Sequence, residues 1–220
     1  KDAKALANSI LSGLPEGRRV PIPQSVSLVG HAKNIHINFP SSQMTYYLGQ
    51  SGVRREDPDY VTLKVGNELL GGFYQQSRLF DTLRNNHGLV YSINSVVVPY
   101  PFGGPMVVIF QTKDASAAQA LALVNRTVKF FLSNASSQSD LLLVKNLLVG
   151  RLYREMVSNK NKVDLLSQLA FDDLPLNYYD EYVRGIRQVT VQDIIRAFSK
   201  NIHPDRWVTV EVGDLKKDSR

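Results

Sequence analysis

Cysteine is absent from the 220 residues of the sequence. Without it the chain can contain no disulfide framework, no thiol nucleophile and no zinc site built on thiolates. A chain without cysteine suits the cytoplasm and an oxidising compartment equally, so the absence does not indicate where the protein acts. Two further signatures are missing. No G-x-S-x-G nucleophile elbow occurs, and Gly71-Gly72 is not followed by the Gly-Lys-Ser of a phosphate-binding loop.

Histidine is scarce, with four residues scattered along the chain: His31, His36, His87 and His203. A catalytic zinc site needs three protein ligands that converge on the metal. The first two histidines are five positions apart, which would place them on different faces of a helix, and His36 falls within a strand pattern. Because the histidines do not converge, we expect this chain to hold no metal and no cofactor of its own. Composition alone leaves a Ser-His-Asp arrangement open.

Long hydrophobic runs are missing as well. The most apolar stretch runs from Leu141 to Val149, and Lys145 and Asn146 interrupt it well short of the ~20 residues of a membrane span. We expect no membrane insertion. The first ten residues lack the apolar region of a signal peptide. Because the chain begins with Lys inside a helical pattern, we expect it to be a fragment of a longer protein.

The formal net charge is +6, but no basic cluster accompanies it. Basic residues occur as scattered pairs, such as Arg18-Arg19, Arg54-Arg55 and Lys216-Lys217, and no aromatic residues interleave with them. A nucleic-acid site would need such a cluster, and a single-strand site would need aromatic stacking platforms. We therefore expect a solvated basic surface and no nucleic-acid partner.

The spacing of apolar residues predicts strands early in the chain and at its end, with helices between them. Strands are expected at 34–39, 44–50, 90–99, 106–112 and 207–212. Helices are expected at 3–14, 59–70, about 77–86, 114–131, 139–157, 163–171, 178–186 and 190–199. Residues 20–30 are expected to form a loop with a possible edge strand. This order is typical of an α+β fold, an antiparallel-rich sheet with helices packed on one face, to which the last strand returns.

Some local signals are specific. In residues 34–39, Ile35, Ile37 and Phe39 alternate with polar residues, which predicts a half-buried strand. Asp114 is expected to cap the helix that follows it. Thr190 and Asp193 form a capping-box pattern, with Asp in place of the usual Glu.

The stretch from Leu69 to Ser92 organises the rest of the chain. An apolar helix ends at Gly71-Gly72, a second helix begins near Ser77, and a strand starts at Val90 after a turn at Gly88. The double glycine permits backbone angles that other residues avoid and allows another backbone to approach closely. Two helices, two glycine breaks and a strand thus follow one another within 24 residues.

This stretch resembles the second, metal-free half-domain of the pitrilysin- and insulysin-type zinc metallopeptidases, the inverted zincins. The pattern of that half-domain reads roughly G-G-x4-S-R-L-F-x-x-L-R-x-x-x-G-L-x-Y-S. It is matched here by Gly71, Gly72, Ser77, Arg78, Leu79, Phe80, Leu83, Arg84, Gly88, Leu89, Tyr91 and Ser92. Weaker similarity runs from Arg55 to about Val212, which covers nearly the whole chain. The family more often has charged residues where Asn-Asn-His follows Arg84.

The resemblance implies a particular α/β roll, with residues 1–220 as a single half-domain. In the family, two half-domains close like a clamshell around a peptide. The first half binds zinc through His-x-x-Glu-His on a helix, a motif that this chain lacks. Zinc would then be the cofactor of the partner half, which is either part of the same polypeptide or a separate subunit.

Arg84 and Tyr91 match the residues with which the metal-free half reaches the substrate. In a peptidase, a Tyr hydroxyl can stabilise the oxyanion of the attacked carbonyl, and an Arg fork can hold substrate carbonyls or a carboxylate. The residues alone favour simpler roles: a helix-end cation that bonds to local carbonyls, and a sheet aromatic that packs on a neighbour. The resemblance favours the substrate-binding and transition-state roles.

The resemblance therefore predicts the non-catalytic, substrate-binding half of a zinc metallopeptidase. Such a domain would be inactive alone and would need a zinc-bearing N-terminal half and a peptide substrate as partners. The alternative is a scaffold or assembly subunit that retains the peptidase fold without proteolysis. The compartment stays open, with the bacterial periplasm and cytoplasm both compatible.

Overall fold

The computed structural model describes residues 2–18, 20–21, 24, 30–72 and 76–214. Its centre is a five-stranded sheet with the order β1-β5-β2-β4-β3. β1 and β5 are parallel, and the other neighbouring strands are antiparallel. The last strand does return to the sheet, where it lies between the first two. The strands are β1 (Lys33–Asn38), β2 (Gln43–Ser51), β3 (Val90–Val97), β4 (Pro105–Lys113) and β5 (Val208–Gly213).

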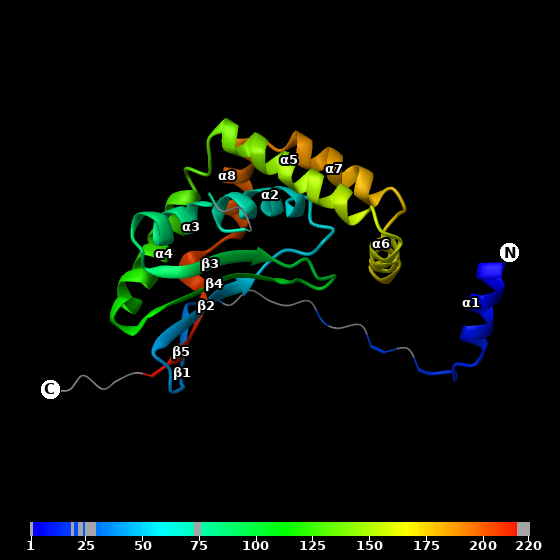
Figure 1. Ribbon diagram of the computed structural model, residues 1–220, viewed down its shortest axis with the longest axis horizontal. Helices are drawn as coiled ribbons and strands as arrows, with labels where there is room; N and C mark the ends of the chain where they lie inside the picture. The colour runs from blue at the N-terminus through cyan, green and yellow to red at the C-terminus, as the bar shows by residue number, and fades with distance from the viewer. Residues whose placement is uncertain (1, 19, 22–23, 25–29, 73–75, 215–220) are drawn as a thin grey trace.

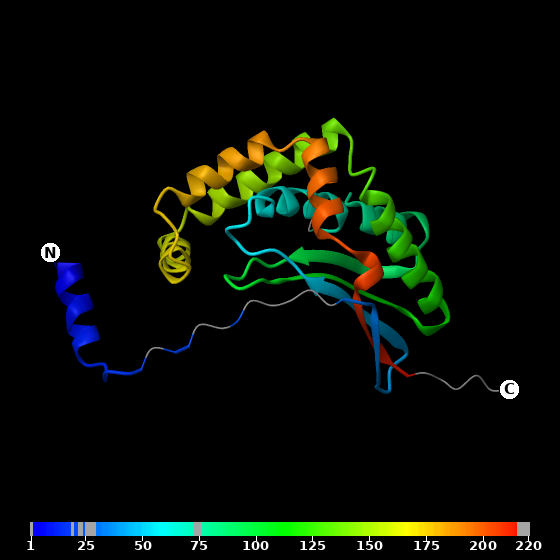
Figure 2. The same cartoon turned by 180° about the vertical axis from the view of Figure 1, so that it is seen from behind.

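Helices gather on one face of this sheet (Figures 1 and 2). The central one is α2 (Tyr60–Leu70), which contacts α5, α7, α8 and β3. The others are α3 (Arg78–Phe80), α4 (Ala117–Phe131), α5 (Gln138–Glu155), α6 (Asn159–Phe171), α7 (Tyr178–Gln188) and α8 (Val191–Asn201), with short turns η1 (Asp81–Asn86), η2 (Asp114–Ser116) and η3 (Pro204–Arg206). The predicted α+β class, an antiparallel-rich sheet with helices on one face, is confirmed.

The core forms where alternate residues of β2 and β4 point towards the helices. Met44, Tyr46 and Leu48 of β2 are at most 3% exposed. Tyr46 stacks on Phe110 of β4 with ring centroids 4.9 Å apart. Because the side-chain period of a strand is two, the residues between them point to the other face. No helix covers that face in Figures 1 and 2.

The two expected caps differ in outcome. The Thr190–Asp193 capping box is present: Asp193 N–H donates to Thr190 Oγ1 at 3.1 Å, and Thr190 N–H donates to Asp193 Oδ2 at 3.0 Å. Asp114 is not a cap. It opens the short turn η2, and the N-cap position of α4 falls on Ser116.

The alternation in β1 is present, but its apolar side is not buried. Ile37 is 49% exposed and Phe39, just after the strand, is 59% exposed. Through its register with Val212 of β5 and Thr45 of β2, Ile37 belongs to the uncovered face. Alternation shows that a strand has two different sides, but it does not reveal which side the helices cover. The expected loop and possible edge strand at 20–30 lie largely outside the described residues.

The N-terminal helix α1 (Asp2–Ser12) stands apart from the sheet and the other helices (Figure 1). None of its described residues is buried, and Leu6, Ile10 and Leu11 are 61–64% exposed. The sequence predicted that this helix ends two residues later, at Leu14. Its apolar face has no partner among the described residues.

Candidate functional site

Arg84 projects from an irregular helix. Helix α3 continues directly into η1, which is a π-helical turn rather than an α-helical one. Buried Leu79 and Leu83 anchor this segment in the core, while Arg84 is exposed. A π turn inserts one extra residue into a helix and often occurs at functional sites, because the insertion rotates the following side chains.

A short, well-bonded turn joins this helix to β3. Gly88 has a φ of +60°, a left-handed conformation that suits glycine, and its N–H donates to the carbonyl of Arg84 at 3.0 Å. Leu89 N–H donates to the carbonyl of Leu83 at 2.9 Å, and Thr112 of β4 donates its hydroxyl to the carbonyl of Leu89 at 2.7 Å. These bonds fix the turn against the sheet.

Tyr91 lies in a second irregularity, at the start of β3. Val90 pairs with Thr112 and Ile93 pairs with Phe110, so Tyr91 and Ser92 together oppose a single residue of β4. Such a bulge bends the strand and redirects side chains, and bulges are over-represented beside active sites. Tyr91 is 80% exposed, although both residues flanking the bulge are buried.

The two irregular segments bring Arg84 and Tyr91 into contact. Arg84 Nη1 donates to the backbone carbonyl of Tyr91 at 2.6 Å. The guanidinium carbon lies 4.9 Å from the centroid of the Tyr91 ring and 5.1 Å from that of Phe80, so the cation is held between two aromatic rings. The carbonyl bond occupies one of the five N–H donors of arginine, which leaves other donors for a ligand.

The structure thus places the two predicted site residues together on an exposed rim. The bond from Arg84 to a nearby carbonyl is the simpler role considered for it, and it also fixes the position of the guanidinium. Sequence reasoning included Phe80 in the motif but missed its contact with Arg84, the π turn and the bulge. Phe80 precedes Arg84 by four positions, a spacing that places side chains side by side on a helix, so this contact could have been anticipated.

No group of three or more His, Asp or Glu side chains that could hold a metal occurs in the described ranges. Three of the histidines have other contacts. His36 Nδ1 lies 3.5 Å from Glu211, His87 Nδ1 contacts the carbonyl of Thr82 at 2.8 Å, and the backbone N–H of His203 donates to the side-chain oxygen of Gln50. In addition, no helix of the described chain is both apolar and long enough to cross a lipid bilayer.

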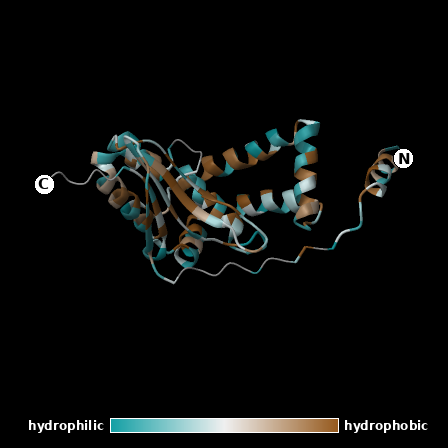
Figure 3. Ribbon diagram, turned by 90° about the horizontal axis from the view of Figure 1, so that it is seen from below, coloured by the Kyte–Doolittle hydropathy of each residue, from teal (hydrophilic) through white to brown (hydrophobic). Residues whose placement is uncertain are grey.

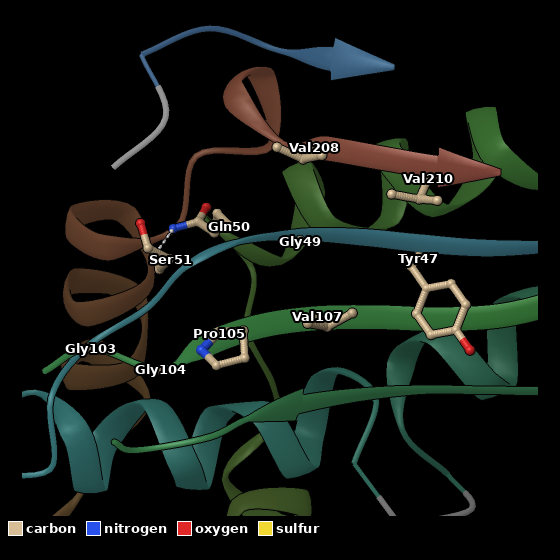
Figure 4. Close-up of a pocket in the computed structure, with 10 residues that line it drawn as sticks. All are labelled: Tyr47, Gly49, Gln50, Ser51, Gly103, Gly104, Pro105, Val107, Val208 and Val210. Carbon is tan, nitrogen blue, oxygen red and sulfur yellow. Dashed lines mark hydrogen bonds between the residues drawn. The ribbon is translucent and has the colours of Figure 1, made fainter. Parts of the chain in front are cut away.

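A second feature is the uncovered face of the sheet, which is apolar. It contains a shallow cavity of about 440 Å³, whose lining includes Tyr47, Gly49, Val107, Val208 and Val210 (Figure 4). Figure 3, which views the molecule from below, shows hydrophobic residues along the strands. An apolar surface of this kind on a sheet is typical of an interface.

The comparisons with known proteins agree on one family. A family model described as "Peptidase M16 inactive domain" matches residues 1–148. The curated relative "Non-peptidase homolog YmxG" of Helicobacter pylori is 24% identical over 218 residues, which are 96% of this chain and 49% of the relative. "Probable inactive metalloprotease YmfF" of Bacillus subtilis is 24% identical over 151 residues, which are 69% of this chain and 34% of the relative.

A solved structure described as a peptidase M16 inactive domain from Pseudomonas fluorescens superposes with a TM-score of 0.89 at 32% identity. The match covers 97% of this chain and 50% of the solved one. The present chain therefore spans about half the length, or less, of the relatives that it matches. The resemblance found in the motif around Arg84 is confirmed at the level of the family.

Proposed function

Because the chain belongs to the peptidase M16 inactive-domain family, we propose that it is the substrate-binding half of a zinc metallopeptidase. Within this proposal, Arg84 and Tyr91 reach into a chamber that the zinc-bearing half completes. The observation that carries it is the construction of the Arg84–Tyr91 rim. A π turn, a left-handed Gly88 and a bulge follow one another within a dozen residues. π turns and bulges are over-represented at functional sites, where they redirect side chains.

Tyr91 is suited to donate a hydrogen bond to the substrate. Its exposed ring is held against the guanidinium of Arg84, which limits the directions that the hydroxyl can take. A hydroxyl placed where charge develops on the attacked carbonyl stabilises the transition state more than the ground state. The zinc of the partner half would supply the activated water.

Arg84 is suited to hold the peptide in place. Its guanidinium is fixed by Phe80, by the Tyr91 ring and by the Tyr91 carbonyl, so little side-chain entropy is lost when a substrate binds. The remaining N–H donors can bond to substrate carbonyls or to a carboxylate. This role affects binding of the peptide, whereas the role of Tyr91 affects the chemical step.

The proposed partner has surfaces to cover. The uncovered sheet face around Tyr47 and Val210 is apolar, and helix α1 exposes Leu6 and Ile10. Both would be shielded from water if a second half-domain packed against this one. The chain's length, about half that of its relatives, is consistent with a missing half.

The alternative is a scaffold that retains the fold without proteolysis. The word "non-peptidase" in the name of the Helicobacter pylori relative favours it. Under this alternative the same apolar surfaces would hold an assembly together, and the Arg84–Tyr91 rim would have no ligand.

A reconstitution experiment separates the two. The zinc-bearing half, from the same polypeptide or a neighbouring reading frame, is purified alone and together with this chain. We expect peptide hydrolysis from the pair, none from this chain alone, and loss of the activity on chelation. A paired complex that forms but cleaves no peptide with zinc loaded would contradict the proposal and support the scaffold.

A further inference from the structure

A separate cavity lies on the helical side of the sheet, between α2, α5 and α7. Its volume is about 270 Å³, and its lining includes the cations Arg55, Lys64 and Arg151, the tyrosines Tyr60, Tyr178 and Tyr182, and the carboxylate of Glu155. It shares no residue with the Arg84–Tyr91 rim or with the cavity on the open sheet face.

Two of its three cations are already neutralised. Arg55 Nε lies 2.8 Å from Asp172 Oδ2, and Arg151 Nη1 lies 3.2 Å from Glu68 Oε1. The two carboxylate side chains are 3% and 2% exposed, so these pairs are fixed in the protein wall. They form charged but balanced sides of the cavity.

Lys64 is the exception. It projects from α2, one helical turn from Tyr60 and one from Glu68, and no carboxylate oxygen lies within 4.0 Å of its amine among the residues that the structure describes. Burial lowers the pKa of Lys64, and the attraction of Glu68 and Glu155 only partly opposes this effect. A largely buried ammonium without an ion-pair partner is costly, and an incoming anion would relieve that cost.

Tyrosine rings form the apolar part of the cavity. Tyr60 and Tyr178 each stack against Tyr182, with ring centroids 6.4 and 6.2 Å apart. Burial raises the pKa of Tyr60 and of Tyr182 well above that of a free tyrosine, so both hydroxyls stay protonated and can act only as neutral groups. Aromatic surface beside a few polar groups is typical of a site for a small organic ligand.

We propose that this cavity binds a carboxylate carried on an apolar group, with Lys64 as its counterion and the tyrosine rings against its apolar part. Lys64 is the one cation of this lining with no carboxylate oxygen within 4.0 Å among the described residues, and a single such cation matches a monoanion. A dianion such as phosphate is disfavoured, because the exposed carboxylate of Glu155 in the cavity lining adds repulsion. The carboxylate can come from the C-terminus of a peptide or from an acidic side chain. The site stands independently of the proposed peptidase role.

Calorimetric titration of the 220-residue chain tests the proposal with four probes: N-acetyl-leucine, N-acetyl-leucinamide, N-acetyl-glutamic acid α-amide and inorganic phosphate. We expect binding of at least one carboxylate probe and none of leucinamide or phosphate. N-acetyl-leucine represents a C-terminal carboxylate and the glutamic acid derivative represents an acidic side chain. The ratio of their affinities therefore identifies which kind of carboxylate the cavity binds. Equal binding of the neutral amide, preferential binding of phosphate, or no binding of either carboxylate would overturn the proposal.

Lys64→Met keeps an unbranched side chain only one heavy atom shorter and removes the charge, so it should weaken binding of the carboxylate at least tenfold. Lys129→Met removes an exposed lysine of α4 and should bind as the wild type does. An NMR titration of the wild-type lysine amines provides a readout that needs no variant. Saturating N-acetyl-leucine or the glutamic acid derivative, whichever binds, should raise the pKa of Lys64, and an unchanged Lys64 pKa with bound ligand would place that ligand elsewhere.

Discussion

Asp59 and Arg84 are both charged residues of the helical layer, but their surroundings differ. Asp59, with a side chain that is 4% exposed, accepts hydrogen bonds from Arg196 at 3.0 Å, Lys200 at 2.7 Å and Asn201 at 3.1 Å. Arg84 is exposed, and its guanidinium donates a hydrogen bond to the backbone carbonyl of Tyr91. A charge whose bonding capacity is filled by the protein stabilises the fold, whereas one with donors to spare is available to a ligand.

The largest expected change in stability is at Asp59. Asp59→Ala removes three hydrogen bonds to charged or polar partners that join the start of α2 to α8. Because Arg196 and Lys200 are each 58% exposed and can return to water, we expect a loss of about 2–3 kcal/mol in the free energy of unfolding. Urea denaturation measures it. Asp205→Ala, at a 70% exposed side chain, is the control and should stay within about 0.5 kcal/mol.

Arg84→Ala should affect binding more than folding. In the assembled peptidase we expect KM to rise about tenfold, which corresponds to roughly 1.4 kcal/mol, with a smaller change in kcat. The exposed contacts with Phe80 and Tyr91 contribute about 0.5–1 kcal/mol to stability, so the chain should remain folded. Steady-state kinetics and urea denaturation separate the two effects. If Arg84→Ala instead lost as much stability as Asp59→Ala and left KM unchanged, Arg84 would be a structural residue like Asp59, which would contradict its proposed role in binding.

Low pH should destabilise the fold by protonating Asp59. Burial tends to raise the pKa of Asp59, but hydrogen bonds from Lys200, Asn201 and Arg196 outweigh it and hold the pKa below its ordinary value of 3.8. The folded protein therefore binds this proton less readily than the unfolded chain. The stabilisation is fully present above pH 3.8 and is lost as the pH falls through the folded pKa.

Asp59→Asn removes the titrating carboxylate, so its stability should fall less steeply than that of the wild type below pH 3.8. Thermal melting across this pH range measures the two slopes. Parallel curves for wild type and variant would show that Asp59 is not held by its three partners in the folded state.

The smallest expected change in stability is at Tyr91. Tyr91→Phe keeps the ring against Arg84 and removes a hydroxyl from a side chain that is 80% exposed. The free energy of unfolding should therefore change by no more than about 0.5 kcal/mol. A larger loss would assign the hydroxyl to the fold rather than to a ligand.

The sequence predicted the regular elements well, because the spacing of apolar residues depends on which side chains of a helix or strand are buried. It placed β2 and β4 and the capping box of α8 to within a residue or two. It could not tell which side of β1 is covered, since that depends on helices distant in the chain. Asp114 failed as a cap because the chain first makes a 3-10 turn, a choice that the residue type does not determine.

For the candidate site, the motif identified Arg84 and Tyr91 but not the backbone that brings them together. Gly88 indicated the turn in the sequence, and in the structure it adopts the left-handed conformation. The π turn contains the buried Leu83 and the bulge precedes the buried Ile93, and no local sequence pattern indicated either irregularity. The burial of Lys64 could not be predicted for a similar reason. The residues of α5 and α7 that line its cavity lie more than 80 positions further along the chain.

The measurement that tests the central claim most directly is kcat for peptide cleavage by the zinc-bearing half paired with either wild-type chain or Tyr91→Phe. The account predicts a fall of roughly 100-fold, the loss typical of a removed oxyanion donor, with unchanged assembly and melting temperature. Wild-type turnover by the Tyr91→Phe pair would contradict it, and the scaffold function would then be the better explanation of the fold.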